Sequence, residues 1–124
     1  MEKSRTEEFT HNGKNFVYID LSGIKVNEEF TEVIKGIKPV IARYPENSLY
    51  TITSIENIRV DTEALDLIAD YMKFNKPYVK YGAVIGLDGV KKLMLNLVFR
   101  LSGRDNMIAA FSREQAVELL SKKE

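Results

Sequence analysis

Residues 9–21 read Phe-Thr-His-Asn-Gly-Lys-Asn-Phe-Val-Tyr-Ile-Asp-Leu, and this stretch predicts a β-hairpin followed by a buried strand. Asn-Gly is the pair that best tolerates the positive φ angles of a type I′ turn, so Asn12 and Gly13 predict the tip of a β-hairpin. The strand after the tip places Val17, Ile19 and Leu21 on one face and Phe16, Tyr18 and Asp20 on the other. Both faces are largely apolar, which is typical of a strand that is covered on both sides.

A helix is predicted after this strand. Asn27 is a suitable N-cap, and acidic residues at 28 and 29 are favourable in the first helical turn. Apolar side chains then recur at helical spacing, at Phe30, Val33, Ile34, Ile37 and Ile41. Pro39 lies inside this pattern and lacks the amide that would bond to the carbonyl of Lys35. We therefore expect a kink or an early end of the helix near residues 36–39.

Strands and helices keep alternating through the rest of the sequence. The predicted elements are a strand over 49–55, a helix from Asp61 to about Phe74, a strand over 79–87, a helix from about 89 to 101, a strand over 106–111 and a last helix opened by the capping box Ser112-x-x-Gln115. This order predicts an α/β fold with a mixed, mostly parallel β-sheet, an antiparallel edge hairpin and about four helices. We expect residues 1–124 to form a single domain, with residues 1–5 as a loose N-terminus.

Composition narrows the possible functions. The 124 residues contain 18 Lys plus Arg and 18 Asp plus Glu, so the formal net charge is zero and gives no general attraction to nucleic acid or to an anionic membrane. The sequence has no Cys, and His11 is its only His, so thiolate chemistry and histidine-based catalytic triads are excluded within one molecule. Residues 1–10 hold no apolar leader and no stretch is long enough to span a membrane, so the expected location is the cytoplasm. We expect no catalytic residues, no metal and no cofactor.

Four short motifs in the second half of the sequence carry a resemblance to a known family. They are Ala-Val-Ile-Gly-Leu at 83–87, Gly-Val-Lys-Lys-Leu at 89–93, Ser-Gly-Arg at 102–104 and Phe-Ser-Arg-Glu-Gln-Ala at 111–116. Together with the element order, they resemble the SpoIIAA-like branch of the STAS family, a group of small bacterial STAS/SEC14-like proteins. The resemblance implies a non-catalytic regulatory module that binds a protein partner, as STAS-type anti-sigma factor antagonists do.

The resemblance also implies where such a partner would bind. STAS domains use the start of their second helix as a contact and phosphorylation site, which here corresponds to Asp61, Thr62 and Glu63. The antagonists carry Asp-Ser-Ser-Gly at this place, whereas this protein has Glu63 where the phosphorylated Ser would be, and Ala64 in place of Gly. Thr62 is the remaining hydroxyl for a switch. Plain helix capping by Asp61 is the alternative explanation of the same residues.

The helix predicted over 89–101 carries more apolar surface than packing on a sheet requires. Leu95 and Phe99 form a second apolar flank, with Lys92, Arg100 and Arg104 at its rim. Contact with a neighbouring helix, a homodimer or partner interface, and a ligand groove or membrane-surface contact are all compatible with this flank. The groove would suit an alternative function, a small apolar-ligand or lipid-binding domain of SEC14-like type, to which Tyr71, Phe74, Tyr78 and Tyr81 would contribute.

Two further patterns have both a functional and a structural interpretation. Gly82, Gly86 and Gly89 lead from a strand into a helix and could cradle a phosphate, but they match no phosphate-binding motif, and close strand packing explains them. Glu63, Asp66 and Asp70 share one side of a helix and could bind a hard cation, but a solvated charged face is the simpler reading.

Overall fold

The computed structural model describes residues 5–60, 64–87, 96, 103 and 105–123. The strands are β1 (Thr6–His11), β2 (Lys14–Asp20), β3 (Leu49–Ser54), β4 (Val79–Ile85) and β5 (Met107–Ala109). The helices are α1 (Glu28–Ala42), α2 (Leu65–Asn75) and α4 (Arg113–Ser121). This is the predicted α/β order, with three helices among the described residues. The fourth helix, predicted over 89–101, falls on residues outside that part, apart from Asn96.

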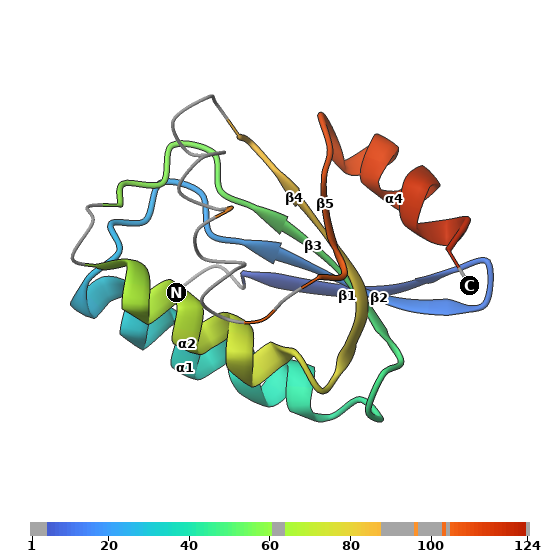
Figure 1. Ribbon diagram of the computed structural model, residues 1–124, viewed down its shortest axis with the longest axis horizontal. Helices are drawn as coiled ribbons and strands as arrows, with labels where there is room; N and C mark the ends of the chain where they lie inside the picture. Colours follow the sequence, from blue (N-terminus) through green and yellow to red (C-terminus); the bar gives the residue numbers. More distant parts are fainter. Residues whose placement is uncertain (1–4, 61–63, 88–95, 97–102, 104, 124) are drawn as a thin grey trace.

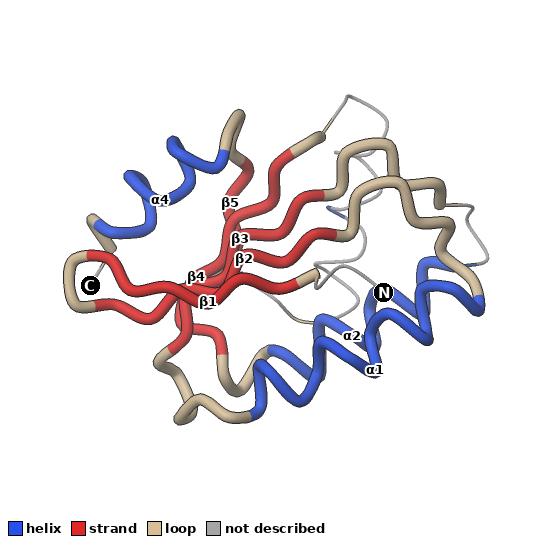
Figure 2. Tube along the Cα trace, turned by 180° about the vertical axis from the view of Figure 1, so that it is seen from behind, coloured by secondary structure: helices blue, strands red, loops and turns tan. Residues whose placement is uncertain are grey.

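The five strands form one sheet in the order β1-β2-β3-β4-β5, with β1 antiparallel to β2 and the other neighbours parallel. This arrangement confirms the mixed sheet with an antiparallel edge hairpin. Because each parallel strand is added beside the previous one, right-handed crossovers place their helices on the same face. Figures 1 and 2 show α1 and α2 side by side on one face of the sheet and α4, alone among the described helices, on the other.

The hairpin tip has the predicted conformation. Asn12 and Gly13 have φ angles of 51° and 74°, as a type I′ turn requires. The two-residue tip pairs His11 with Lys14 and, two residues back, Phe9 with Phe16. This register decides which side chains of β2 lie on each face.

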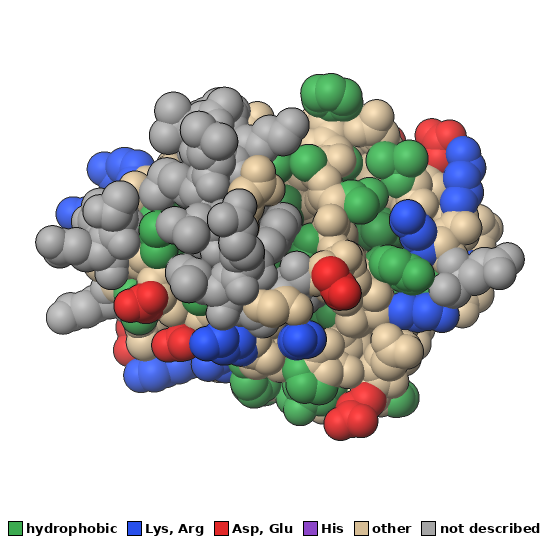
Figure 3. All heavy atoms as spheres, viewed as in Figure 1, with side chains coloured by type: hydrophobic (Ala, Val, Ile, Leu, Met, Phe, Trp, Pro, Cys, Tyr) green, Lys and Arg blue, Asp and Glu red, His purple; other side chains and the backbone are tan. Residues whose placement is uncertain are grey.

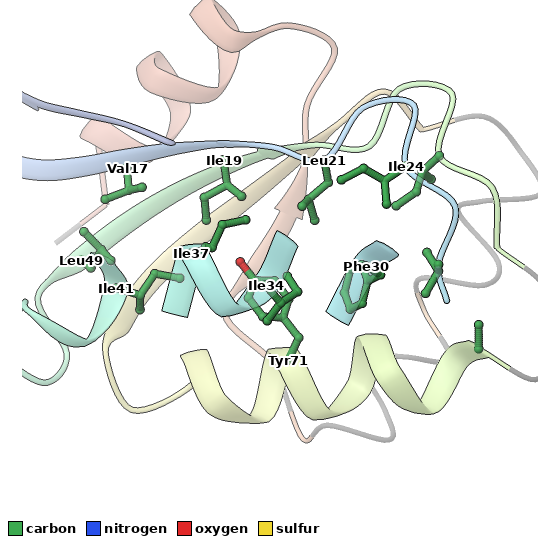
Figure 4. Packing of buried hydrophobic residues seen from close by; sticks show 13 residues of the cluster. Val17, Ile19, Leu21, Ile24, Phe30, Ile34, Ile37, Ile41, Leu49 and Tyr71 are labelled. Carbon is green, nitrogen blue, oxygen red and sulfur yellow. The ribbon is translucent and has the colours of Figure 1, made fainter. Parts of the chain in front are cut away.

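β2 is covered on both faces, as its sequence predicts. Val17, Ile19 and Leu21 pack against α1 and α2, where Figure 4 shows them facing Ile34, Ile37 and Ile41 of α1 and Tyr71 of α2. Phe16 lies on the opposite face and is fully buried with Tyr50, Ile52, Ala116 and Leu120.

Pro39 does not end or shorten α1, so that expectation is wrong. The helix runs without interruption from Glu28 to Ala42. Pro39 removes one hydrogen bond, but Lys35 lies on the exposed side, where water can satisfy its carbonyl. Ile37 and Ile41, on either side of the proline, are 2% and 0% exposed. Burial of each isoleucine contributes about 1.5–3 kcal/mol, which offsets the roughly 3 kcal/mol cost of the proline.

Gly82 of β4 and Gly86, which follows β4 directly, allow close packing against neighbouring segments. A Cβ at Gly82 would lie 2.6 Å from Met107 Sδ and 2.7 Å from Thr51 Oγ1. Gly86 has a φ of +86°, and a Cβ there would lie 2.6 Å from the backbone nitrogen of Glu56. These contacts agree with the packing interpretation of Gly82 and Gly86, while Gly89 lies outside the described residues.

Two alanine substitutions test this assignment. We expect Gly86→Ala to lower the free energy of unfolding by about 2–4 kcal/mol, because it adds a left-handed backbone penalty to a steric clash. The control is Gly36→Ala in α1, where a Cβ would meet nothing within 4 Å. This change should raise stability by about 0.5–1 kcal/mol, since alanine favours helix. Urea unfolding followed by circular dichroism measures both, and equal effects of the two substitutions would contradict the assignment.

Candidate interaction surface

The predicted contact residues Asp61, Thr62 and Glu63 lie outside the described residues, so their role stays a prediction. The backbone just before these residues is held by hydrogen bonds to the loop that leads into α1. Lys25 and Arg59 form an isolated parallel bridge, in which the Val26 N–H donates to the Arg59 carbonyl and the Arg59 N–H donates to the Ile24 carbonyl, each at 2.9 Å. The loops that lead into α1 and α2 therefore run side by side. Ala64 is buried and α2 begins at Leu65.

The second predicted surface also falls outside the described residues, because Leu95, Phe99, Lys92, Arg100 and Arg104 all do. The aromatic residues expected to accompany it are described, and they do not share one surface. Tyr71 is buried with Phe30 of α1, and Phe74 lies beside Tyr78. Tyr81 belongs to the cluster on the opposite face of the sheet.

Phe111 is the most exposed large apolar side chain of the described residues, at 94%. It follows β5 and comes just before α4, where Figure 3 shows hydrophobic side chains at the surface. The backbone at this position nevertheless forms hydrogen bonds with the start of α4. The Phe111 N–H donates to Gln115 Oε1 at 2.7 Å, and the Gln115 N–H donates to Ser112 Oγ at 3.1 Å. The Ser112 side of the predicted capping box is thus confirmed, whereas Gln115 accepts from the N–H of Phe111, one residue before the N-cap, and so holds the backbone of an exposed phenyl ring.

Phe111 and the start of α2 lie at the same end of the sheet. β2 to β5 are parallel, so their carboxyl ends meet at one edge, and the loops into α1 and α2 leave from that edge. Phe111 follows the carboxyl end of β5 by two residues. We call this region the carboxyl end of the sheet.

Arg113 joins α4 to the hairpin. Its guanidinium lies 4.4 Å from the ring centre of Tyr18 and 5.1 Å from that of Phe9, and it forms an ion pair with Glu7. The aromatic rings and the carboxylate therefore hold the first turn of α4 over β1 and β2. We call these four residues the Arg113 clasp.

A row of aromatic rings crosses the sheet beside the clasp. Phe9 stacks on Phe16 at 5.1 Å, Phe16 lies 5.4 Å from Tyr50, and Tyr50 lies 6.0 Å from Tyr81. These residues are direct cross-strand neighbours in β1, β2, β3 and β4. Lys14 lies over the Tyr50 ring and Lys123 over the Tyr81 ring. Burial, with Tyr81 nearby, raises the pKa of Tyr50. The row packs within the hydrophobic cluster on this face of the sheet.

Glu8 links β1 to the other layer. The Tyr44 hydroxyl donates to Glu8 Oε1 at 2.6 Å, and Arg43 donates to Glu8 Oε2 at 3.0 Å. Burial, the hydrogen bond to Glu8 and the charge of Glu8 together raise the pKa of Tyr44 from 10.0 to about 12. The adjacent residues Glu7 and Glu8 thus tie the edge strand to α4 on one face and to the end of α1 on the other.

The described residues hold no group of three His, Cys, Asp or Glu that could bind a metal ion. Asp66 and Asp70, two of the candidate cation ligands, are both exposed on α2, and the third, Glu63, is not among the described residues. His11 is exposed at the end of β1, edge-on to Phe16. Within the same described ranges, no helix has the length and apolar character needed to cross a membrane.

Neither a scan of protein-family models nor a search among curated proteins finds a match to this sequence. The resemblance to the STAS family therefore rests on the motifs and the element order alone.

Sequence reasoning missed the clasp and the exposure of Phe111. The Phe9–Phe16 pair could have been found, because a two-residue hairpin tip fixes the register of the strands. The position of Arg113 could not, since it depends on how α4 crosses the sheet. Phe111 occupies the position before an N-cap that often packs onto the helix, so its exposure could not be read from the motif.

The salt dependence of stability separates the contribution of the Arg113–Glu7 ion pair from that of the stacking of Arg113 on Tyr18 and Phe9. We expect Arg113→Lys to lower the free energy of unfolding by about 0.5–1 kcal/mol, because lysine keeps the charge but loses the planar stacking. Glu7→Gln should cost less, since the ion pair is partly exposed. In about 1 M salt the Glu7→Gln effect should vanish while the Arg113→Lys effect persists. Loss of both effects in salt would show that stacking contributes nothing.

Alkaline titration tests the Tyr44–Glu8 contact. Below pH 10.0 tyrosine is protonated in both the folded and the unfolded protein, so the contact contributes fully. As the pH rises from 10.0 to about 12, only the unfolded protein loses this proton, so stability falls. Tyrosinate absorbance of the wild type minus that of Tyr44→Phe should show a group titrating near 12, and Glu8→Gln should lower that pKa. Titration of Tyr44 near its ordinary value in the wild type would rule the contact out.

Proposed function

We propose that this protein is a non-catalytic regulatory module that binds a protein partner through the carboxyl end of its sheet, in the manner of the STAS-type antagonists it resembles. The observation that carries the proposal is Phe111, a phenyl ring 94% exposed on a backbone that the capping box holds in place. An exposed aromatic on a hydrogen-bonded backbone loses little backbone entropy on binding, and aromatic residues, Phe included, are enriched at the cores of protein interfaces.

The contact site that the sequence predicts at the start of α2 supports this proposal. Asp61, Thr62 and Glu63 come just before α2, whose loop leaves the same end of the sheet as Phe111. A partner that covers this end would then contact both an apolar anchor and a polar, modifiable helix start. The element order supports the resemblance, since a hairpin followed by parallel strands and helices is what the family pattern implies.

Affinity capture with quantitative mass spectrometry tests the proposal. We expect a partner that binds the wild type to bind Phe111→Ser at least about tenfold more weakly, because a central aromatic anchor contributes about 2 kcal/mol or more. Thr62→Ala combined with Glu63→Ala should weaken the same partner. The control is Leu119→Ser, which alters a residue 38% exposed farther along α4 and should retain binding.

Two results would contradict the proposal. One is a wild-type protein that captures no other protein reproducibly, and the other is a partner that both sets of variants retain at wild-type affinity. Co-purified lipid in native mass spectrometry, with a thermal shift on adding lipid, would favour the alternative apolar-ligand or lipid-binding function instead.

A further inference from the structure

The tip of the β1–β2 hairpin is accessible to solvent on both of its residues. Asn12 and Gly13 are both exposed to solvent, and a Cβ placed on Gly13 would meet nothing within 4 Å. The strand pairing ends at His11 and Lys14, so neither tip residue belongs to the ladder. Among the described residues, the Gly13 N–H donates to no backbone carbonyl.

We propose that Asn12 is a site of spontaneous deamidation in the folded protein. The Gly13 nitrogen attacks Cγ of Asn12, a new C–N bond closes an imide ring, and the bond between Cγ and Nδ2 of Asn12 breaks. The displaced nitrogen leaves as ammonia and takes up the proton from the Gly13 amide. Water then opens the imide at either carbonyl and yields aspartate or isoaspartate, with nothing oxidised or reduced.

Two other asparagines provide an internal comparison. Asn47 and Asn57 are also exposed and have φ angles of 56° and 57°, close to the 51° of Asn12. Their backbone conformation therefore does not distinguish them from Asn12.

The residue that follows each asparagine is different. The Ser48 N–H donates to the Tyr78 carbonyl at 3.2 Å, and the Ile58 N–H donates to the Ile55 carbonyl at 3.1 Å. Both nitrogens are thus held by hydrogen bonds, and both residues have a Cβ that crowds the attack. Of the three, Gly13 alone presents a nitrogen that is free of both obstacles.

Isoaspartate at position 12 would also disturb the edge strand β1. Isoaspartate adds a carbon to the backbone of a two-residue turn, so the pairing of His11 with Lys14 can no longer be kept without strain. Glu7 and Glu8, which hold β1 to the two layers, lie a few residues away. The isoaspartate form should therefore have a looser edge strand than the aspartate form.

Incubation of the folded, full-length protein in mildly alkaline buffer, with peptide mapping by mass spectrometry, tests the proposal. The peptide with Asn12 should gain the amide-to-acid mass difference at least severalfold faster than those with Asn47 and Asn57, and an isoaspartyl methyltransferase should label it. Isolated isoaspartate protein should unfold at lower urea than Asn12→Asp. An Asn12 that stays unchanged, or that converts no faster than Asn47 and Asn57, would overturn the proposal.

Ser48→Gly separates the structural cause from the sequence motif. It gives Asn47 a following glycine but leaves the backbone hydrogen bond to the Tyr78 carbonyl available. Asn47 should then remain slower than Asn12, because its attacking nitrogen is still held. Equal rates at the two sites would show that the free Gly13 amide is irrelevant.

Discussion

The structure depends on β2 being buried on both faces. β2 lies between β1 and β3 in the sheet, and its side chains enter both hydrophobic clusters. A shift of one residue in its register would exchange the two faces. The tip at Asn12 and Gly13 prevents that shift, because it allows only the pairing of His11 with Lys14.

The two faces of the sheet are covered unequally, and this explains the contacts that β1 makes. α1 and α2 cover one face together, whereas among the described elements α4 covers the other alone. An edge strand has unpaired backbone groups and needs protection. Glu7 and Glu8 point to opposite faces and reach Arg113 and Tyr44, respectively. The adjacent charges of Glu7 and Glu8 therefore protect the edge strand β1 from pairing with other strands and also bind it to the helices on both faces of the sheet.

The binding proposal rests on Phe111, whose backbone is hydrogen-bonded while its side chain is exposed. Arg113 fixes the start of α4 against the hairpin, and Gln115 fixes the backbone of the residue before the N-cap. The phenyl ring of Phe111 is left in solvent on this hydrogen-bonded backbone, although apolar residues of its size are usually buried. The carboxyl end of the sheet thus combines an exposed apolar side chain with the loops that lead into α1 and α2.

Local structure could be read from the amino-acid sequence: the Asn12–Gly13 turn, the two apolar faces of β2, the caps at Asn27 and Ser112, and the alternation of strands and helices that makes β2 to β5 parallel. These features depend on residues close together in the sequence. The tertiary structure alone decided that α1 continues through Pro39, that Arg113 stacks on Tyr18, and that Phe111 is exposed while Tyr81 and Tyr71 lie on opposite faces. Each of these outcomes depends on contacts between segments distant in sequence, whose burial energy outweighs or redirects local preference.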